Sequence, residues 1–151
     1  MLLRLEKVTS DNWRKAVFLT TDPNREFPLD ERWILSNAYS LLQCIYDEEW
    51  DCRILMDGDQ AVGFVFYGHL PEEARYMLCR YMIDVKYQGQ GYGKAFLPLV
   101  VDQIRSQFHC ADIHTSVDDD NSCAIHLYTS YGFERTEEMD DEERVYVLRG
   151  K

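Results

Sequence analysis

The sequence predicts a single α/β domain with a mixed sheet, spanning residues 1–151. Short stretches with alternating apolar residues, typical of strands, are interleaved with longer segments whose apolar residues recur at helical spacing. The chain is long enough for one domain with its own core, and no linker, internal repeat or low-complexity tract divides it. The expected order is a strand, two helices, three strands, a helix, a strand, a helix and two strands, about seven strands and four helices in all.

The first third of the chain carries one strand pattern and two helix patterns. Residues 2–8 alternate between apolar and polar side chains and predict a strand. Thr9 and Asp11 are N-cap candidates for a short helix over about residues 12–19. A second helix is expected to follow, with Asp30 as its cap. Its apolar positions are Ile34, Ala38, Leu41, Leu42 and Ile45.

The middle of the chain is expected to form a hairpin and then a long central strand. Strands are predicted over residues 52–56 and 61–67, because the intervening Asp57-Gly58-Asp59 is typical of a hairpin turn. Gly63, inside the second of these strands, indicates a close backbone approach or a bulge. The central strand is expected over residues 76–85.

Three glycines follow the central strand at alternate positions, Gly89, Gly91 and Gly93. An amphipathic segment then continues to about Phe108 and predicts a helix. Glycine permits positive φ angles and lets the backbone approach a ligand closely. The free N–H groups and the positive dipole end of a new helix favour an anion. A strand, a glycine turn and a helix start therefore predict a phosphate-binding site.

The last third of the chain predicts a strand, a helix and two further strands. Residues 111–117 alternate as a strand, and residues 122–131 show helical spacing. Residues 118–121, between them, are expected to form a loop that supplies the N-cap of this helix. Gly132 lies where a left-handed helix stop is expected. Residues 133–137 and 144–148 are expected to form the last two strands, around an acidic turn.

Charge restricts the class of partner. The chain has 27 acidic and 16 basic residues and a formal net charge of −11. This balance argues against nucleic-acid binding, which needs a basic face, and favours a cationic small molecule or a basic peptide. The alternative is that the acidity serves solubility alone. No apolar run is long enough for a membrane-spanning helix and the N-terminus lacks the apolar core of a signal peptide, so we expect a cytoplasmic protein without membrane association.

The five cysteines include no C-x-x-C pair, and the four histidines show no ligand spacing. We therefore expect no metal site. An odd number of scattered cysteines predicts the reduced thiols of an intracellular protein, most of them small core residues. Cys79 is expected to be a buried, neutral thiol rather than a nucleophile.

The glycine turn does not match the common nucleotide-binding motifs. In Gln88-Gly-Gln-Gly-Tyr-Gly93 the third glycine comes one residue too early for the dinucleotide fingerprint G-x-G-x-x-G. The chain also lacks G-x-x-x-x-G-K-S/T, the motif of the nucleotide P-loop. The pattern that remains is Gln88-x-x-Gly91-x-Gly93 between a strand and a helix.

A second segment makes this pattern specific. It reads Asn121-x-x-Ala124-x-x-x-Tyr128-x-x-x-Gly132-Phe133. The two segments together, in this order and at this separation, resemble the GNAT family of N-acetyltransferases. The order of elements matches that family as well, so the resemblance covers essentially the whole chain. It implies a single GNAT-type domain with a mixed, mostly antiparallel twisted sheet and a splayed central strand.

The resemblance also implies a role for each matching residue. Acetyl-CoA would be the co-substrate, its pyrophosphate held by main-chain N–H groups of the glycine turn. These residues are Gly89, Gln90, Gly91, Tyr92, Gly93 and Lys94, directly after Gln88 of the motif. The strand Tyr81-Met82-Ile83 would splay from its neighbour and pair with the pantetheine arm, and an N–H near Ile83 would polarise the thioester carbonyl. Asn121 would touch the arm.

Tyr128 carries the expected catalytic role. The resemblance implies that it protonates the leaving thiolate as a general acid, and an ordinary phenol has a pKa close enough to that of a thiol for this transfer. The alternative is a core tyrosine, because Ala124, Leu127, Tyr128 and Tyr131 form an apolar stripe at helical spacing.

The general base is not assigned. Polyamine-type members of the family often carry an acid on the central strand at the position that Cys79 occupies here. Three explanations stay open. A neighbouring acid such as Asp118 or Glu73 acts through water, water alone accepts the proton, or the acceptor is not a polyamine.

Among its relatives the chain looks most similar to bacterial spermine/spermidine and other small-amine acetyltransferases. This similarity implies direct acetyl transfer, in a ternary complex, to a primary amine such as a polyamine. Three alternatives remain: a protein or peptide amine as acceptor, a non-catalytic CoA-binding regulatory module, and an interaction protein that uses an acidic face. A homodimer is expected by analogy with the family.

Overall fold

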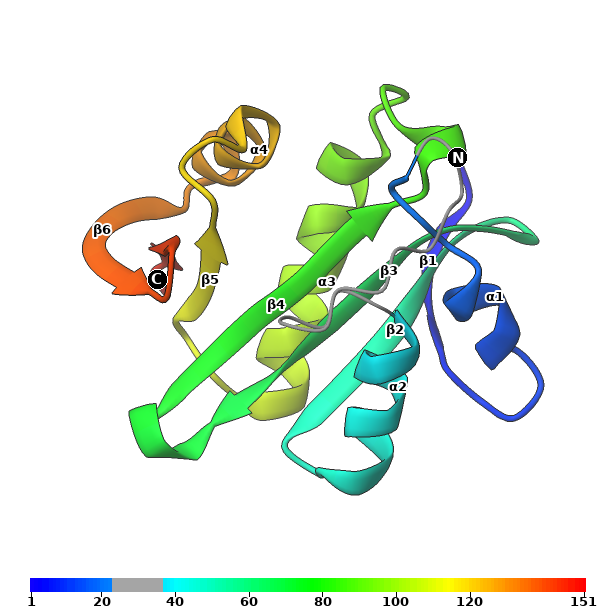
Figure 1. The fold of residues 1–151 in the computed structure, drawn as a ribbon, viewed down its shortest axis with the longest axis horizontal. Helices are drawn as coiled ribbons and strands as arrows, with labels where there is room; N and C mark the ends of the chain where they lie inside the picture. The colour runs from blue at the N-terminus through cyan, green and yellow to red at the C-terminus, as the bar shows by residue number, and fades with distance from the viewer. Residues whose placement is uncertain (23–36) are drawn as a thin grey trace.

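The structure of the protein is a computed structural model, which describes residues 1–22 and 37–151 (Figure 1). Its helices and strands follow the expected order. They are β1 (Leu3–Lys7), α1 (Trp13–Val17), α2 (Asn37–Tyr46), β2 (Trp50–Asp57), β3 (Gln60–Leu70), β4 (Arg75–Ile83), α3 (Tyr92–Phe108), β5 (Ile113–Val117), α4 (Ser122–Tyr131), β6 (Glu134–Asp140) and β7 (Glu143–Leu148). The cap expected at Asp30 lies outside the described residues.

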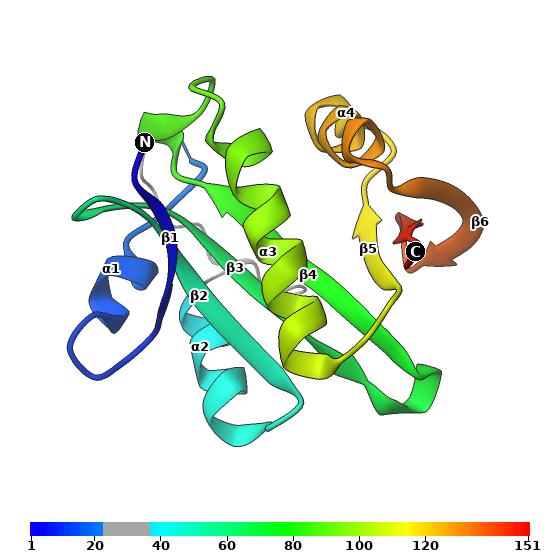
Figure 2. The same cartoon turned by 180° about the vertical axis from the view of Figure 1, so that it is seen from behind.

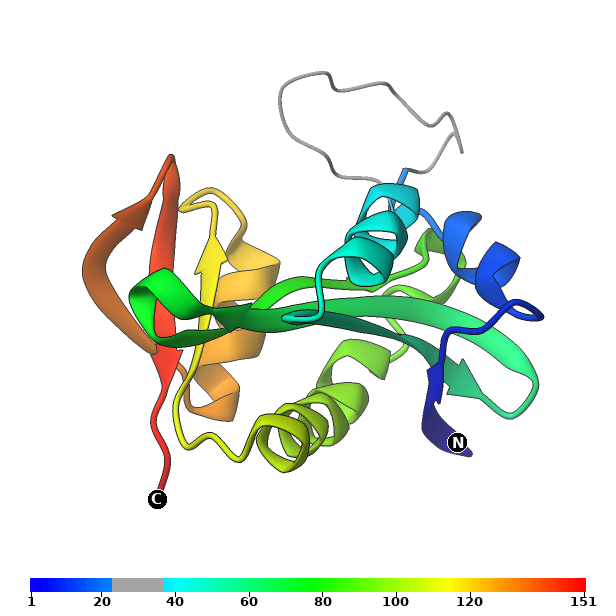
Figure 3. The same cartoon turned by 90° about the horizontal axis from the view of Figure 1, so that it is seen from below.

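The seven strands form one sheet in the order β1-β2-β3-β4-β5-β7-β6. The β4–β5 pair is parallel, and the other neighbouring strands are antiparallel. Figure 3 shows the sheet from below, with α1 and α2 on one face and α3 and α4 on the other. The structure therefore confirms the single domain with a mixed, mostly antiparallel sheet.

Two apolar cores hold these layers together. The larger core lies between the sheet and the α3–α4 layer and contains, among others, Phe96, Val100, Ile104, Tyr128 and Tyr146. The smaller core lies under α1 and α2 and includes Ala16, Leu19, Ile54, Phe64 and Phe66. Because side chains alternate along a strand, β2 and β3 contribute to both cores.

Several strands begin or end a few residues from the expected positions, and two of these boundaries, at the ends of β4 and β6, have a clear physical cause. β4 ends at Ile83 because the carboxylate of Asp84, which is 2% exposed, accepts hydrogen bonds from the N–H groups of Thr20 and Lys86, both at 3.0 Å. The chain then turns through the 3₁₀ segment Val85–Tyr87. β6 extends to Asp140, into the first part of the expected acidic turn, since an exposed edge strand can carry charged residues that leave no apolar alternation in the sequence.

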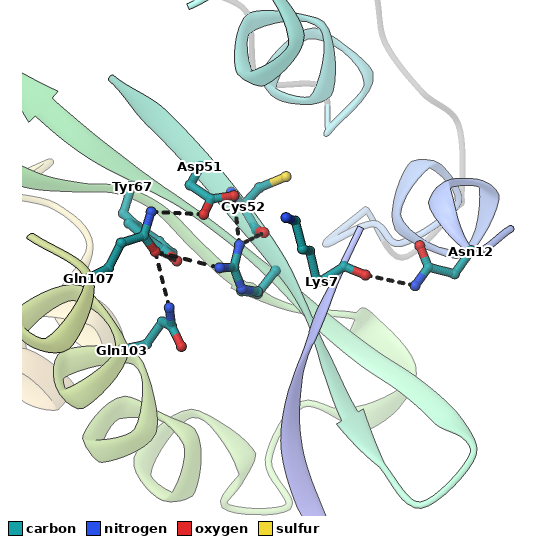
Figure 4. A network of polar contacts seen from close by, with 8 residues as sticks. Lys7, Asn12, Asp51, Cys52, Tyr67, Gln103 and Gln107 are labelled. Carbon is teal, nitrogen blue, oxygen red and sulfur yellow. Dashed lines mark hydrogen bonds and ion pairs between the residues drawn. The ribbon is translucent and has the colours of Figure 1, made fainter. Parts of the chain in front are cut away.

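Helix α3 is anchored at both ends. Near its C-terminal end, Gln107 accepts a 2.9 Å hydrogen bond from the phenol of Tyr67 and donates one of 2.9 Å to Asp51 (Figure 4). The same Asp51 pairs with Arg53 at 2.6 Å. At its N-terminal end, Tyr92 donates a 2.7 Å hydrogen bond to Asp57. These contacts fix the start of α3 relative to β2 and β3.

Candidate functional site

The candidate site begins where β4 and β5 part. The two strands pair only at Met77 and His114, near their starts, and diverge toward their carboxyl ends (Figures 1 and 2). The hydroxyl of Thr115 donates a 2.8 Å hydrogen bond to the carbonyl of Leu78 and marks the last link between them. The splay expected for residues 81–83 is therefore present.

The parting leaves one edge of β4 without a partner strand. The N–H of Asp84 donates to Val62 at 2.9 Å, and Met82 faces Phe64 in the β3–β4 register. Because hydrogen-bonding direction alternates along an antiparallel pair, the N–H and C=O groups of Tyr81 and Ile83 point away from β3. They point into the space between the diverging ends of β4 and β5, which we call the opening. An amide-bearing chain can pair with such an edge.

The close approach of β3 to this part of β4 depends on Gly63. A side chain at that position would collide with the carbonyl of Met82 and touch Leu55. Gly63 also lies beside a register shift in the β2–β3 pair. The close backbone approach predicted at Gly63 is confirmed.

The glycine turn presents bare backbone at the carboxyl end of β4. Gly89 and Gly91 have positive φ angles of 73° and 87°, and no heavy atom lies within 4 Å of the position that a side chain would take at either residue. Gly91 is the N-cap of α3 and offers no side chain to the first helical turn. The N–H groups of Tyr92, Gly93 and Lys94 have no protein acceptor among the residues that the structure describes. The turn therefore fits an anionic group such as a pyrophosphate.

Side chains of the expected cofactor-binding residues hold this turn in place. Gln88 donates to the carbonyl of Ile83 at 3.0 Å, and Gln90 donates to the carbonyl of Lys86 at 3.1 Å. The phenol of Tyr81 donates to the carbonyl of Gly93 at 2.6 Å. These side chains serve the loop itself, which leaves the main-chain N–H groups for a ligand.

Tyr128 is at once a core residue and a neighbour of the opening. It is 6% exposed, and its ring packs against Phe133 with ring centroids 5.1 Å apart. Burial raises the pKa of its phenol, a hydrogen bond with Thr115 lowers it, and the nearby Cys79 side chain and the charge of Glu143 raise it further. The phenol therefore stays protonated at neutral pH, as a proton donor must.

Asn121 occupies the N-cap of α4. Its Oδ1 accepts a 3.1 Å hydrogen bond from the N–H of Ala124, which confirms the cap predicted for this segment. The residue is exposed. Capping occupies one oxygen and leaves the side-chain amide nitrogen for a further contact.

Cys79 is exposed, and the prediction that it is buried was wrong. The β3–β4 register steps from Phe66 opposite Arg80 to Tyr67 opposite Leu78, which leaves Cys79 as the unpaired residue of a bulge. A bulge turns a side chain away from the position that simple alternation assigns it. Partial removal from water and the charges of Asp140 and Glu143 nevertheless raise the pKa of the thiol to about 12, so it stays neutral as expected.

The remaining cysteines divide between the core and the surface. Cys52 is buried, Cys44 and Cys110 are partly buried, and Cys123 is exposed. Within residues 1–22 and 37–151, no group of three His, Cys, Asp or Glu side chains is placed to hold a metal ion. In the same ranges no helix has the length and apolarity needed to cross a membrane.

The two acids considered as general bases differ in position. Glu73 precedes β4, where it lies 3.4 Å from Arg75, at the end of the strand away from the opening. Asp118 directly follows β5, and its carboxylate accepts a 2.8 Å hydrogen bond from the N–H of Asp120 within the loop. A third acid, Glu143, was not expected from the sequence. It accepts a 2.7 Å hydrogen bond from Ser116 of β5.

An apolar hollow on the surface lies elsewhere. It has a volume of about 630 Å³ and is lined by residues of β1, α1, α2 and β2, including Val8, Trp13, Leu41 and Cys52. None of the expected cofactor-binding residues lines it. We therefore assign the candidate site from the strand geometry, not from the hollow.

Comparison with known proteins defines the class. A model of the acetyltransferase (GNAT) family matches residues 10–133, so the chain belongs to this family. This match confirms the expected fold and the expected class of enzyme, an acyltransferase. Acetyl-CoA is the acetyl donor that the sequence resemblance implied for this family.

Individual relatives point to amine acceptors. The chain is 31% identical to the spermine/spermidine N(1)-acetyltransferase of Bacillus subtilis strain 168, over 97% of this chain and 98% of that protein. A spermidine N-acetyltransferase from Vibrio cholerae, solved with CoA and spermine, matches with a TM-score of 0.72 at 18% identity, over 99% of this chain and 96% of that one. The ribosomal-protein-S18-alanine N-acetyltransferase of Escherichia coli matches with a TM-score of 0.66 at 20% identity, over 96% and 90%.

Proposed function

We propose that this protein transfers an acetyl group from acetyl-CoA to a primary amine, by direct attack in a ternary complex, and that the acceptor is a polyamine or another small amine. One observation supports this most strongly. The free edge of β4, the glycine turn at its end and the Tyr128 phenol all border the parting of β4 and β5.

Acetyl-CoA binding follows from the backbone geometry. The N–H groups of residues 89–94 would hold the pyrophosphate, helped by the dipole of α3 and the exposed charge of Lys94. The main-chain N–H and C=O groups of Tyr81 would pair with amides of the pantetheine arm, as an added strand does, since the carbonyl of Ile83 already accepts a hydrogen bond from Gln88. The amide of Asn121, at the start of α4, would contact the same arm from the other side of the opening.

The chemistry needs a donor to the carbonyl and a proton for the sulfur. The N–H of Ile83 polarises the thioester carbonyl, because its direction is set by the β3–β4 ladder before the substrate arrives. The amine then attacks, the C–S bond breaks, and Tyr128 protonates the departing sulfur. Burial raises the pKa of this phenol, but the same dry surroundings raise the pKa of the thiol, so the transfer stays balanced.

The choice of a polyamine as the acceptor rests on the net charge of the protein and on its similarity to a relative with a named substrate. The formal net charge of −11 attracts a cation, and the Bacillus subtilis relative is named for spermine and spermidine. Since Cys79 stands where such enzymes often carry an acid, a carboxylate that takes the proton of the amine would come from another position in the chain.

One observation favours a second candidate, a peptide or protein amine. The guanidinium of Arg80 on β4 has a buried Nη1 without a hydrogen-bond partner, and burial lowers its pKa to about 10. Arg80 faces Phe66, so it lies on the α1–α2 face of the sheet. An acceptor with an anionic group beside its amine would pair with it.

The test is a thiol-release assay with acetyl-CoA and a panel of spermidine, spermine, shorter diamines and peptide amines. We expect turnover with the polyamines. Turnover with peptides alone would favour the second candidate, and CoA binding without turnover on any amine would indicate a regulatory module. Calorimetric titration with CoA that shows no binding would contradict every acetyltransferase assignment.

The expected homodimer and the cytoplasmic location stay predictions, as do the absence of membrane and nucleic-acid partners. Light scattering after size exclusion measures the first directly. A monomer at micromolar concentration would contradict the homodimer.

A further inference from the structure

Glu143, the first residue of β7, lies at the opening between β4 and β5. The antiparallel register of β5 and β7 sets Val117 opposite Arg144, which brings residue 143 to the end of β5. The hydroxyl of Ser116 donates a 2.7 Å hydrogen bond to Oε2 of Glu143. The position of this carboxylate is therefore determined by the strand that borders the opening.

Glu143 and Tyr128 approach the opening from opposite faces of the sheet. Ile113, Thr115 and Val117 are buried on the α3–α4 side, and side chains alternate along a strand. Ser116 and the Glu143 carboxylate bound to it therefore lie on the other face. The amine adds to one face of the trigonal carbonyl carbon, and the thiolate leaves from the tetrahedral intermediate that forms. The group that takes the proton of the amine and the group that protonates the sulfur therefore have different positions around that carbon.

The charge of Glu143 affects ionisable groups on both α4 and β4. It is one of the charges that raise the pKa of the Tyr128 phenol on α4 and of the Cys79 thiol on β4, after the larger effect of burial in each case. Among the described residues, no other acid has this effect on both groups. The Glu143 carboxylate therefore lies close enough to affect Cys79, the position at which related polyamine acetyltransferases often carry an acid, although Glu143 comes from a distant part of the chain.

Glu143 forms no ion pair with a described residue, whereas its charged neighbours are engaged. Arg144 lies 3.5 Å from Asp119. Glu138 accepts bonds of 2.6 Å and 2.7 Å from Arg75. Asp140, on β6, contributes to the charge around Cys79 but not to that around Tyr128. Among the residues that the structure describes, no cation therefore lies within ion-pair distance of Glu143 at the opening.

We propose that Glu143 binds the ammonium group of the acceptor and receives its proton, directly or through one water. This inference rests on the proposed N-acetyltransferase function. The ammonium R–NH₃⁺ loses one proton to the carboxylate and becomes R–NH₂. The lone pair forms the N–C bond, the C–S bond breaks, the sulfur is protonated through Tyr128, and the nitrogen loses its second proton. The balance is one amide, one CoA thiol and one proton released to solvent.

The test replaces Glu143 with glutamine in the full chain, with thiol release as the assay. We expect kcat/KM for the amine to fall about 100-fold in E143Q, with the KM for acetyl-CoA unchanged. The deficit should shrink as the pH rises toward about 10, because a free alkylamine then loses its proton without help. A purely structural role would not produce this pH-dependent recovery.

Three further variants complete the design. Glu142→Gln removes the same charge from the adjacent turn and should leave kcat/KM within about twofold. Ser116→Ala removes the bond that orients Glu143 and should lower kcat/KM less than E143Q does, which tests the proposal even if E143Q folds poorly. Cys79→Glu in the E143Q background should recover part of the activity, by restoring an acid at the expected position.

An E143Q enzyme with the kcat/KM and pH profile of the unmodified protein would overturn the proposal, as would equal losses in E143Q and Glu142→Gln. Failure of the proposed function looks different. In that case the unmodified protein itself releases no thiol with any amine.

Discussion

The phenol of Tyr81 on β4 donates a 2.6 Å hydrogen bond to the carbonyl of Gly93 in the first turn of α3. This bond connects the strand whose free edge would bind the pantetheine arm to the turn that would bind the pyrophosphate. Because Tyr81 is largely removed from water and lies near the Tyr128 phenol, its pKa is raised and the phenol remains a donor. The two halves of the cofactor site are thus set relative to each other before any ligand binds.

Replacing Tyr81 with phenylalanine should therefore weaken CoA binding. The lost hydrogen bond is worth about 0.5–1.5 kcal/mol, so we expect the Kd for CoA to rise roughly threefold to tenfold. Calorimetric titration measures it. Tyr87→Phe is the matched control, since the Tyr87 hydroxyl forms no hydrogen bond with a described residue and its loss should leave the Kd unchanged. Equal Kd values for both variants would contradict the proposed link.

Gly91→Ala should separate backbone strain from ligand binding. The residue has φ = 87° and open space beside it, so alanine meets no clash but pays about 1–2 kcal/mol for the left-handed conformation. Gly58, in the β2–β3 hairpin, has φ = 57° and is equally open. We expect both alanine variants to lose similar free energy of unfolding in urea, and only Gly91→Ala to bind CoA more weakly. Weaker binding in both would show a general effect of destabilisation.

Tyr128→Phe should lower kcat by about 100-fold or more while the protein stays folded. The ring packs against Phe133 and belongs to the core, and phenylalanine preserves that contact. A thermal melt close to that of the unmodified protein, together with unchanged CoA affinity, would separate the chemical role of the hydroxyl from the structural role of the ring. A variant with nearly full kcat would leave Tyr128 as a core residue alone.

Stability should decrease at alkaline pH. Burial is the main cause that raises the pKa values of Tyr67, Tyr81 and Tyr128 above the ordinary value of 10.0. A group whose pKa is raised on folding stabilises the protein fully below its unfolded pKa, and that stability is lost as the pH rises above it. The free energy of unfolding should therefore fall above pH 10, after a smaller decline that begins near pH 9 because the pKa of the Cys79 thiol is also raised on folding. Urea titrations across this range measure it, and a level profile up to pH 11 would contradict the assignment.

Local patterns in the sequence account for most of the candidate site. The glycine turn is visible because positive φ angles at Gly89 and Gly91 demand a residue type, and the cap of α4 is visible because Asn121 satisfies an N–H three residues away. Helix periodicity places Tyr128 on an apolar face. Each of these features depends on neighbours close in the chain, so the order of elements and the cofactor-binding segments could be predicted.

Long-range pairing decided the rest. Cys79 is exposed because β3 and β4 slip by one residue there, and nothing in the residues around Cys79 encodes a register. β6 carries no apolar alternation, because an edge strand meets water, and its length is set by β7. Glu143 reaches the opening only because β7 pairs with β5. The sequence by itself determined the glycine turn, the starts of α3 and α4 and the acyltransferase family, whereas α1 has its N-cap at Asn12 and not at Thr9 or Asp11. The tertiary structure alone decided which acid lies beside the reaction centre, since that depends on strand pairing between segments far apart in the chain.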